Sequence, residues 1–186
     1  MPPKRPPRPI TQPPDARLLW IERERSFGRW LHGAAAQKWV VLLLASVSRF
    51  GDGWIWYGVV VALPIVAGGG GTAASIRLIT VGAVDLLVYV VIKRWVRRPR
   101  PFVACSDFRA CARTLDEYSF PSGHTLHAVA FSVVLCAYWP QVGWVVWPFA
   151  VLVALSRTVL GLHYVSDVIA GAALGALIAE VSFQFF

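Results

Sequence analysis

Residues 73–92 read AASIRLITVGAVDLLVYVVI, and this stretch decides the fold. A helix needs about 20 mostly apolar residues to cross the hydrocarbon core of a bilayer, and this run has that length. Its charged side chains are Arg77, near the start, and Asp85, in the second half. The stretch therefore predicts a membrane-spanning helix and, with it, an all-α fold class, namely a polytopic membrane helix bundle.

The composition supports an integral membrane protein. Of the 186 residues, 56% are hydrophobic and 15% are charged, whereas soluble domains are about 25% charged. The net charge of +8 comes from the N-terminal tail and from residues 93–100. Neither region is a basic face with interleaved aromatic residues, so we expect no nucleic-acid partner. The three cysteines form no CxxC pair, which excludes a zinc ribbon.

Further apolar runs lie on both sides of residues 73–92. They cover residues 39–50, 54–67, 125–139, 144–155 and 168–186. Counted with their flanks, they predict about six transmembrane helices, of which the first two have the weakest signal. The predicted organisation is a disordered, basic, Pro-rich tail (1–14), an amphipathic interfacial helix (15–37) and a membrane domain (38–186). A plain solvated helix is the alternative for the second segment.

The distribution of positive charge predicts the topology. Eight Lys and Arg residues lie within residues 1–38, so the positive-inside rule places the N-terminus in the cytoplasm. Three spans would then put the polar loop at residues 93–118 on the outer face. Cys105 and Cys111 lie in this loop. An oxidising location would allow a disulfide between them, and two free thiols are the alternative.

With that topology, three polar patches share one edge of the membrane. They are residues 93–101 (KRWVRRPRP), 120–124 (FPSGH) and 156–167 (SRTVLGLHYVSD). Buried charges in an apolar chain are costly unless they are paired, so such residues are candidates for function. A structural ion pair between helices is the alternative for the last patch.

The three patches contain the parts of a phosphate site. Ser122 and Gly123 open a helix, whose free N–H groups and dipole favour an anion. Lys93, Arg100 and Arg157 can neutralise the oxygens of a phosphorus centre. These five residues are the predicted phosphate ligands.

The candidate catalytic groups are His163, Asp167 and His124. His163 and Asp167 are four residues apart, so on a helix they would share a face. The carboxylate could then accept a hydrogen bond from Nδ1–H and leave Nε2 as a general base, a nucleophile or a metal ligand. As a nucleophile, His163 would form a phosphohistidine, while His124 protonates the leaving oxygen. No carboxylate cluster is available for Mg²⁺, so we expect no metal and no cofactor.

The order and spacing of these residues resemble the type 2 phosphatidic acid phosphatase superfamily. Its first motif is similar to Lys93 followed after six residues by Arg100–Pro101. Its second resembles residues 121–124, PSGH, and its third resembles Ser156–Arg157, five residues, His163, three residues and Asp167.

The resemblance covers about two-fifths of the chain. It implies a six-helix membrane bundle, lipid phosphate substrates and no metal, with His163 as nucleophile oriented by Asp167 and His124 as acid. Soluble haloperoxidases of the superfamily are disfavoured by the membrane spans.

Two further residues are candidate accessory groups. His127 lies one helical turn after His124 and would tune that acid, touch the substrate or simply pack. Asp85 lies eight residues before Lys93, which suggests the same helix face, and pairing with Arg77 or a neighbouring helix is its alternative.

The sequence thus predicts a bacterial inner-membrane lipid phosphatase with an outward-facing site. The favoured substrate is undecaprenyl pyrophosphate. Phosphatidate, phosphatidylglycerophosphate and lipid A phosphate are alternatives. A lipid phosphotransferase and a non-catalytic lipid-phosphate binder are more distant ones. The sequence leaves the oligomeric state open.

Overall fold

A computed structural model describes residues 16–114 and 116–185 of the chain. The predicted tail (1–14) lies outside these residues. The described chain is helical apart from its loops and an isolated bridge between Pro99 and Tyr118, which confirms the all-α fold class. The helices are α1 (Ala16–His32), η1 (Gly33–Ala36), α2 (Lys38–Phe50), α3 (Trp54–Val96), α4 (Pro101–Ala104), α5 (Gly123–Tyr138), η2 (Pro140–Val142), α6 (Gly143–Val159) and α7 (Val165–Ser182).

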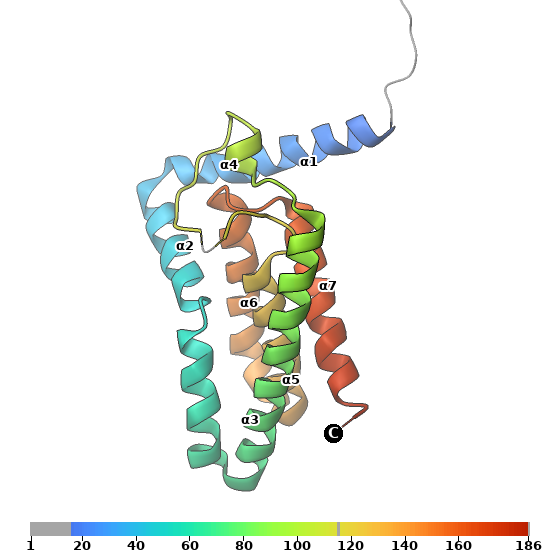
Figure 1. Cartoon of the computed structure of the whole chain (residues 1–186). Helices are drawn as coiled ribbons and strands as arrows, with labels where there is room; N and C mark the ends of the chain where they lie inside the picture. Colours follow the sequence, from blue (N-terminus) through green and yellow to red (C-terminus); the bar gives the residue numbers. More distant parts are fainter. Residues whose placement is uncertain (1–15, 115, 186) are drawn as a thin grey trace, which may run out of the picture.

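Helix α3 is a helical hairpin, because the chain turns back on itself at Gly68 (Figure 1). Gly68 has φ 57°, a left-handed conformation that favours glycine. The two legs touch near this turn, where Ser75 Oγ donates a 2.7 Å hydrogen bond to the carbonyl of Val60. A Cβ on Gly71 would lie only 1.9 Å from the carbonyl oxygen of Leu63, so the close approach also requires glycine.

This hairpin changes the predicted helix count. Helix α2 and residues 54–67 run in the same direction and together form one leg, broken at residues 51–53 (Figure 1). Within the described residues the bundle therefore has five legs: this first leg, residues 72–96, α5, α6 and α7. The prediction of two separate spans over residues 39–67 was wrong. In the part of the chain that the structure describes, three helical segments are long and apolar enough to cross a membrane, namely α3, Pro140–Val159 and α7.

Helix α5 lies at the centre of the bundle and packs against α3, α6 and α7. It approaches α7 most closely at two glycines, since a Cβ on Gly171 or Gly175 would lie 2.5 or 2.2 Å from the carbonyl oxygens of Ser122 and Leu126. This backbone contact fixes the start of α5 against the start of α7. The two elements that carry the second and third motifs are thereby held together.

Helix α1 and the polar loop that follows α3 lie at the same end of the bundle (Figure 1). Arg29 of α1 forms a 2.9 Å ion pair with Asp107 in the loop, and Glu24 forms a 2.8 Å ion pair with Arg98. Two legs, not three, separate α1 from the loop. The predicted odd number of crossings was wrong, so the predicted cytoplasmic N-terminus and outward-facing site exclude each other.

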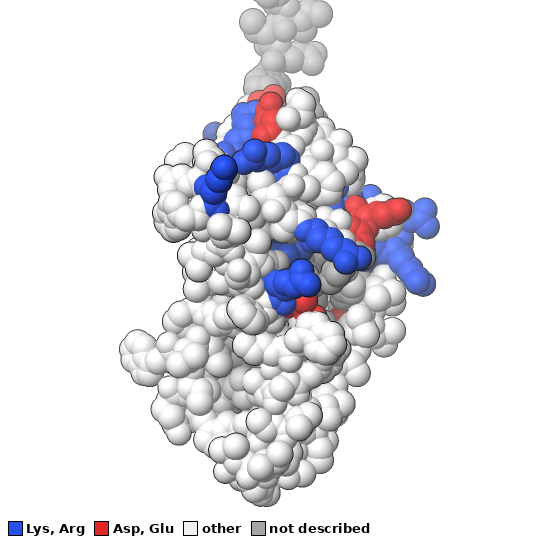
Figure 2. Space-filling model, turned by 90° about the vertical axis from the view of Figure 1, so that its left-hand side faces the viewer, with Lys and Arg blue, Asp and Glu red and all other residues white. Residues whose placement is uncertain are grey.

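Charge is confined to that same end on the face shown in Figure 2, where Lys, Arg, Asp and Glu gather in the upper half and the lower half is white. Large apolar side chains such as Ile65, Val66 and Leu87 are 80%, 82% and 65% exposed. An apolar surface of this extent fits lipid rather than water. The chain is an integral membrane protein whose charged end carries the motif residues.

Candidate active site

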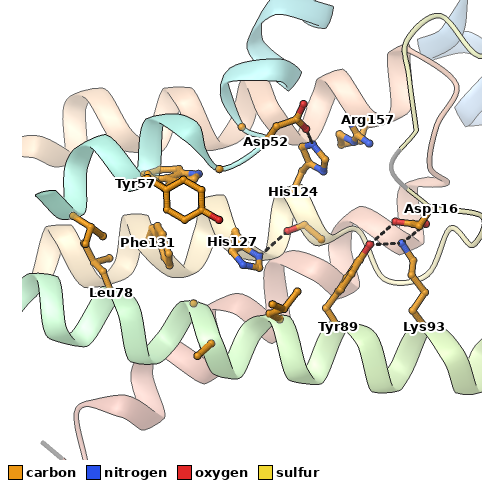
Figure 3. Close-up of a pocket in the computed structure, with 18 of the residues that line it drawn as sticks. Asp52, Tyr57, Leu78, Tyr89, Lys93, Asp116, His124, His127, Phe131 and Arg157 are labelled. Atoms are coloured by element: carbon orange, nitrogen blue, oxygen red, sulfur yellow. Dashed lines mark hydrogen bonds and ion pairs between the residues drawn. The ribbon is translucent and has the colours of Figure 1, made fainter.

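A pocket of about 440 Å³ opens between the first leg, the second leg of α3 and α5 (Figure 3). Its inner part is apolar and is lined by Trp56, Val60, Leu78 and Phe131. Its other end is polar and carries most of the predicted site residues, namely Lys93, Arg100, Gly123, His124, His127, Arg157 and His163. The three motifs therefore converge on one cavity, as the sequence predicted.

His163 presents an unprotonated nitrogen to the cation cluster. Its Nε2 lies 3.2 Å from Nη1 of Arg100, and the side chain is almost completely buried. Because a guanidinium can only donate, Nε2 must be the acceptor and the proton must lie on Nδ1. The expectation that His163 and Asp167 share a helix was wrong, since His163 precedes α7 and only Asp167 lies in its first turn.

The environment keeps His163 neutral. Burial lowers the pKa of its imidazole well below the ordinary value, and the positive charges of Arg157, Arg100 and Lys93 lower it further. A neutral imidazole with a free Nε2 lone pair is the form required of a nucleophile.

Asp167 is held mainly by partners other than His163. Its Oδ2 accepts a 2.9 Å hydrogen bond from the backbone N–H of Tyr164 and lies 3.7 Å from Nδ1 of His163. Its Oδ1 accepts a 2.7 Å hydrogen bond from Arg98. The histidine Nδ1 has no hydrogen-bond partner among the described residues. Asp167 thus faces the proton-bearing side of His163 at a distance that a small ring shift would close.

Arg98 is a site residue that the sequence analysis missed. Its guanidinium bridges Asp167 and Glu24 of α1, and it lies 3.9 Å from the ring centroid of Tyr164. Glu24 also accepts a 3.0 Å hydrogen bond from the backbone of Ser166. One of the four arginines at residues 94–100 could be expected to bind the carboxylate of Asp167, but spacing alone does not say which.

The carboxylate of Asp116 forms ion pairs with Lys93 and Arg100, two of the predicted phosphate ligands, and Figure 3 shows it beside Lys93 and Tyr89. Its Oδ1 lies 2.7 Å from Nζ of Lys93 and 2.8 Å from Nη2 of Arg100, and its Oδ2 accepts a hydrogen bond from Tyr89. Burial by itself raises the pKa of Asp116, but the hydrogen bonds from Lys93 and Tyr89 outweigh it and hold the pKa at about 2. The cations are therefore arranged around a charged carboxylate.

The start of α5 lies at the polar end, as predicted. Gly123 lines the pocket, and a Cβ there would lie 2.6 Å from the ring of Tyr89. Ser122 was predicted as a phosphate donor, but it is fully buried and is not among the pocket-lining residues. Its hydroxyl lies 3.0 Å from that of Thr125, and its N–H donates to the carbonyl of Asp167. In this structure Ser122 joins α5 to α7.

Two site residues have partners on the first leg. His124 Nε2 is hydrogen-bonded to Asp52, and Arg157 donates to the hydroxyl of Ser48. Asp52 is not among the site residues predicted from the sequence. A carboxylate between two glycines in a long apolar region was the available signal for it.

The accessory candidates have different outcomes. His127 lines the pocket one turn deeper than His124, with Nδ1 3.2 Å from the carbonyl oxygen of Gly123. Asp85 is fully buried, does not line the pocket and has no hydrogen-bond partner among the described residues. Eight residues rotate a helix by about 80° beyond two full turns, which points Asp85 away from the face of Lys93. Cys105 and Cys111 are free thiols.

Comparison with known proteins gives several relatives. The chain is 33% identical over 115 residues to phosphatidylglycerophosphatase B of Bacillus subtilis, and it spans about half of that relative (54%) with 56% of its own length. It is 30% identical over 143 residues to the undecaprenyl-diphosphatase of Sulfolobus acidocaldarius (76% of this chain, 68% of the relative). It is 34% identical over 151 residues to the decaprenylphosphoryl-5-phosphoribose phosphatase of Mycobacterium tuberculosis (73% and 74%).

A solved structure shares the fold. The crystal structure of LpxE of Aquifex aeolicus superposes with a TM-score of 0.77 at 21% identity, and the match covers 86% of this chain and 94% of that one. The sequence model of the PAP2 superfamily matches residues 74–186, which include all three motifs. The chain belongs to the PAP2 superfamily, the type 2 phosphatidic acid phosphatases.

Proposed function

We propose that the protein is a lipid phosphatase that works through a phosphohistidine on His163. The observation that carries this proposal is the Nε2 lone pair of His163, which faces Arg100 within a pocket lined by cations. A substrate phosphate that replaces the carboxylate of Asp116 would lie against Lys93 and Arg100. It would then be close to the attacking nitrogen, with Arg157 on the same pocket wall.

The remaining groups fit the two chemical steps. His124 protonates the leaving oxygen as the phosphorus–oxygen bond breaks and the phosphorus–nitrogen bond forms. Water then hydrolyses the phosphohistidine, and Asp167 stabilises the positive imidazole ring during both steps. The cations compensate the charge on the phosphate oxygens, so the reaction needs no metal ion.

The apolar part of the pocket supports a lipid as the substrate. It continues from the polar end along Trp56, Leu78 and Phe131, where a hydrocarbon chain could lie while the phosphate reaches the cations. Helix α1 exposes Trp20, Phe27 and Trp30 at the charged end, which suits the interface of an anionic membrane.

The proposed substrate is a polyprenyl lipid phosphate, with undecaprenyl pyrophosphate first. Its support is the similarity to an undecaprenyl-diphosphatase. A terminal phosphate on a polyprenyl-linked sugar is the second candidate, because the decaprenylphosphoryl-5-phosphoribose phosphatase aligns over 74% of its length. Phosphatidylglycerophosphate follows, since the relative that acts on it aligns over about half of its length (54%).

The test is phosphate release by the purified protein in detergent with EDTA present. Undecaprenyl pyrophosphate, phosphatidate and phosphatidylglycerophosphate are offered side by side, with His163→Ala as the blank. We expect His163-dependent release that is fastest from the polyprenyl substrate. Release that stops with EDTA and returns with Mg²⁺ would exclude the metal-free mechanism. Transfer of phosphate to an added alcohol would indicate a phosphotransferase.

The face on which the site opens is tested with native cysteines. Cys105 and Cys111 lie at the site end, both partly exposed. If a membrane-impermeant maleimide labels them in intact cells, the site faces outward from the bacterial cytoplasmic membrane, as proposed, and the N-terminus lies outside as well. If the two cysteines react only after the cells are opened, the prediction of a cytoplasmic N-terminus holds instead, and the site faces the cytoplasm. The variant with both cysteines changed to Ser is the control for Cys136.

A further inference from the structure

The first leg supplies polar partners to the site although it lies outside the matched family region, which starts at residue 74. Asp52 lies in the break between α2 and α3 and points at His124 (Figure 3). Gly53, the next residue, has φ 111°, a conformation that side chains disfavour. The break therefore directs the carboxylate of Asp52 into the pocket. A continuous helix would instead line this part of the pocket with apolar residues.

The hydrogen bond between Asp52 and His124 assigns the nitrogens of the ring. It joins Oδ1 of Asp52 to Nε2 of His124. An ionised carboxylate only accepts, so Nε2 carries a proton. If His124 is the acid that protonates the leaving group, the remaining nitrogen, Nδ1, must deliver that proton. The side chains of His124 and Asp52 are 11% and 30% exposed, so water competes only partly for this contact.

We propose that Asp52 is a positioning residue for the leaving-group step: it holds His124 by Nε2, so that Nδ1 delivers the proton to the leaving oxygen. This inference rests on the proposed phosphatase function. In the first step the phosphorus–oxygen bond breaks, phosphorus bonds to Nε2 of His163, and the Nδ1 proton of His124 moves to the leaving oxygen. In the second step water attacks phosphorus, the phosphorus–nitrogen bond breaks, and Nδ1 of His124 takes a proton from that water.

A neighbouring contact provides a matched comparison. Ser48 lies one helical turn before Asp52 and accepts a hydrogen bond from Arg157, a predicted phosphate ligand. Both side chains come from the first leg, and each contacts one site residue. Loss of the Ser48 contact should affect phosphate binding with any leaving group, whereas loss of the Asp52 contact should slow the first step only when the leaving oxygen needs a proton.

The experiment compares Asp52→Asn, Asp52→Glu and Ser48→Ala on two kinds of substrate. Phosphatidate has a poor alkoxide leaving group that needs protonation, and p-nitrophenyl phosphate has a good one that does not. The first step is followed as release of the leaving group in a single turnover, which excludes the later hydrolysis. We expect Asp52→Asn to lower this rate on phosphatidate by about 100-fold, within the range of general acid catalysis, and to change the release of p-nitrophenol by less than about threefold. Asp52→Glu should recover part of the loss, and Ser48→Ala should affect both substrates equally.

The outcomes separate the inference from the function. Equal losses on both substrates with Asp52→Asn, or no loss on phosphatidate, would overturn the role of Asp52. So would a further loss when Asp52→Asn is added to His124→Ala, because a residue that acts through His124 has no effect without it. Absence of His163-dependent release from either substrate by the wild type would overturn the proposed function itself. Asp107→Asn, in an exposed ion pair with Arg29, is the control for surface charge.

Discussion

Replacing Asp116 by Asn should make the protein bind phosphate more tightly. The carboxylate of Asp116 occupies the cation cluster, with Oδ1 2.7 Å from Lys93 and 2.8 Å from Arg100. A substrate phosphate must displace it before it can contact both cations. The neutral amide of Asn has a similar shape but competes less, because its bonds to the cations lack the opposite charge.

The size of the effect follows from these contacts. A buried hydrogen bond to a charged group contributes about 1.5–3 kcal/mol. The side chain of Asp116 is 27% exposed, so hydrogen bonds to water replace part of the interaction energy that the carboxylate loses when it leaves the cations. We therefore expect a net gain of about 1.4 kcal/mol for an incoming anion, or about tenfold in affinity.

The assay is the inhibition constant of orthovanadate, measured with wild type, Asp116→Asn and Glu117→Gln. Glu117 is the neighbouring carboxylate; it is exposed and forms no ion pair with the described residues, so it reports the loss of one surface charge. The inhibition constant should fall about tenfold in Asp116→Asn alone. Weaker inhibition in that variant would refute the reasoning, since Asp116 would then be organising the cations and not competing with the substrate. An equal change in both variants would show a long-range charge effect.

Further outcomes are expected at other positions. Arg98→Gln should lower kcat by about tenfold or more with little change in KM, because Arg98 holds Asp167 rather than the substrate. Glu24→Gln should have the same effect but smaller. Both variants are measured by steady-state kinetics. The folded protein should lose stability as pH falls below about 6.5, because the unfolded chain then binds a proton at His163 that the buried neutral imidazole, whose pKa is lowered, does not. Thermal unfolding in detergent should show a shallower pH dependence in His163→Gln. Activity should survive EDTA, measured as phosphate release.

The membrane character of the fold and its helical class could be predicted from residues 73–92 and from the apolar runs around them. The number and direction of the legs could not. Residues 39–50 and 54–67 look like two spans in the sequence, because Gly51–Asp52–Gly53 is a typical turn. In the structure the chain continues in the same direction through this break and reverses only at Gly68. The direction that the chain takes after a helix break depends on what the next segment packs against. Short-range sequence signals do not contain this information.

Hydrophobicity and local spacing are properties of neighbouring residues, so the sequence by itself determined the membrane bundle, the three motifs and the identity of His163, His124 and the cations. Only the tertiary structure decided the contacts that join distant segments: Arg98 with Asp167, Asp116 between Lys93 and Arg100, and Asp52 with His124. Asp52 and His124 are 72 residues apart. Their contact exists because the first leg packs beside α5 and the start of α5 is fixed against α7. That arrangement results from the packing of whole helices, which no local pattern specifies.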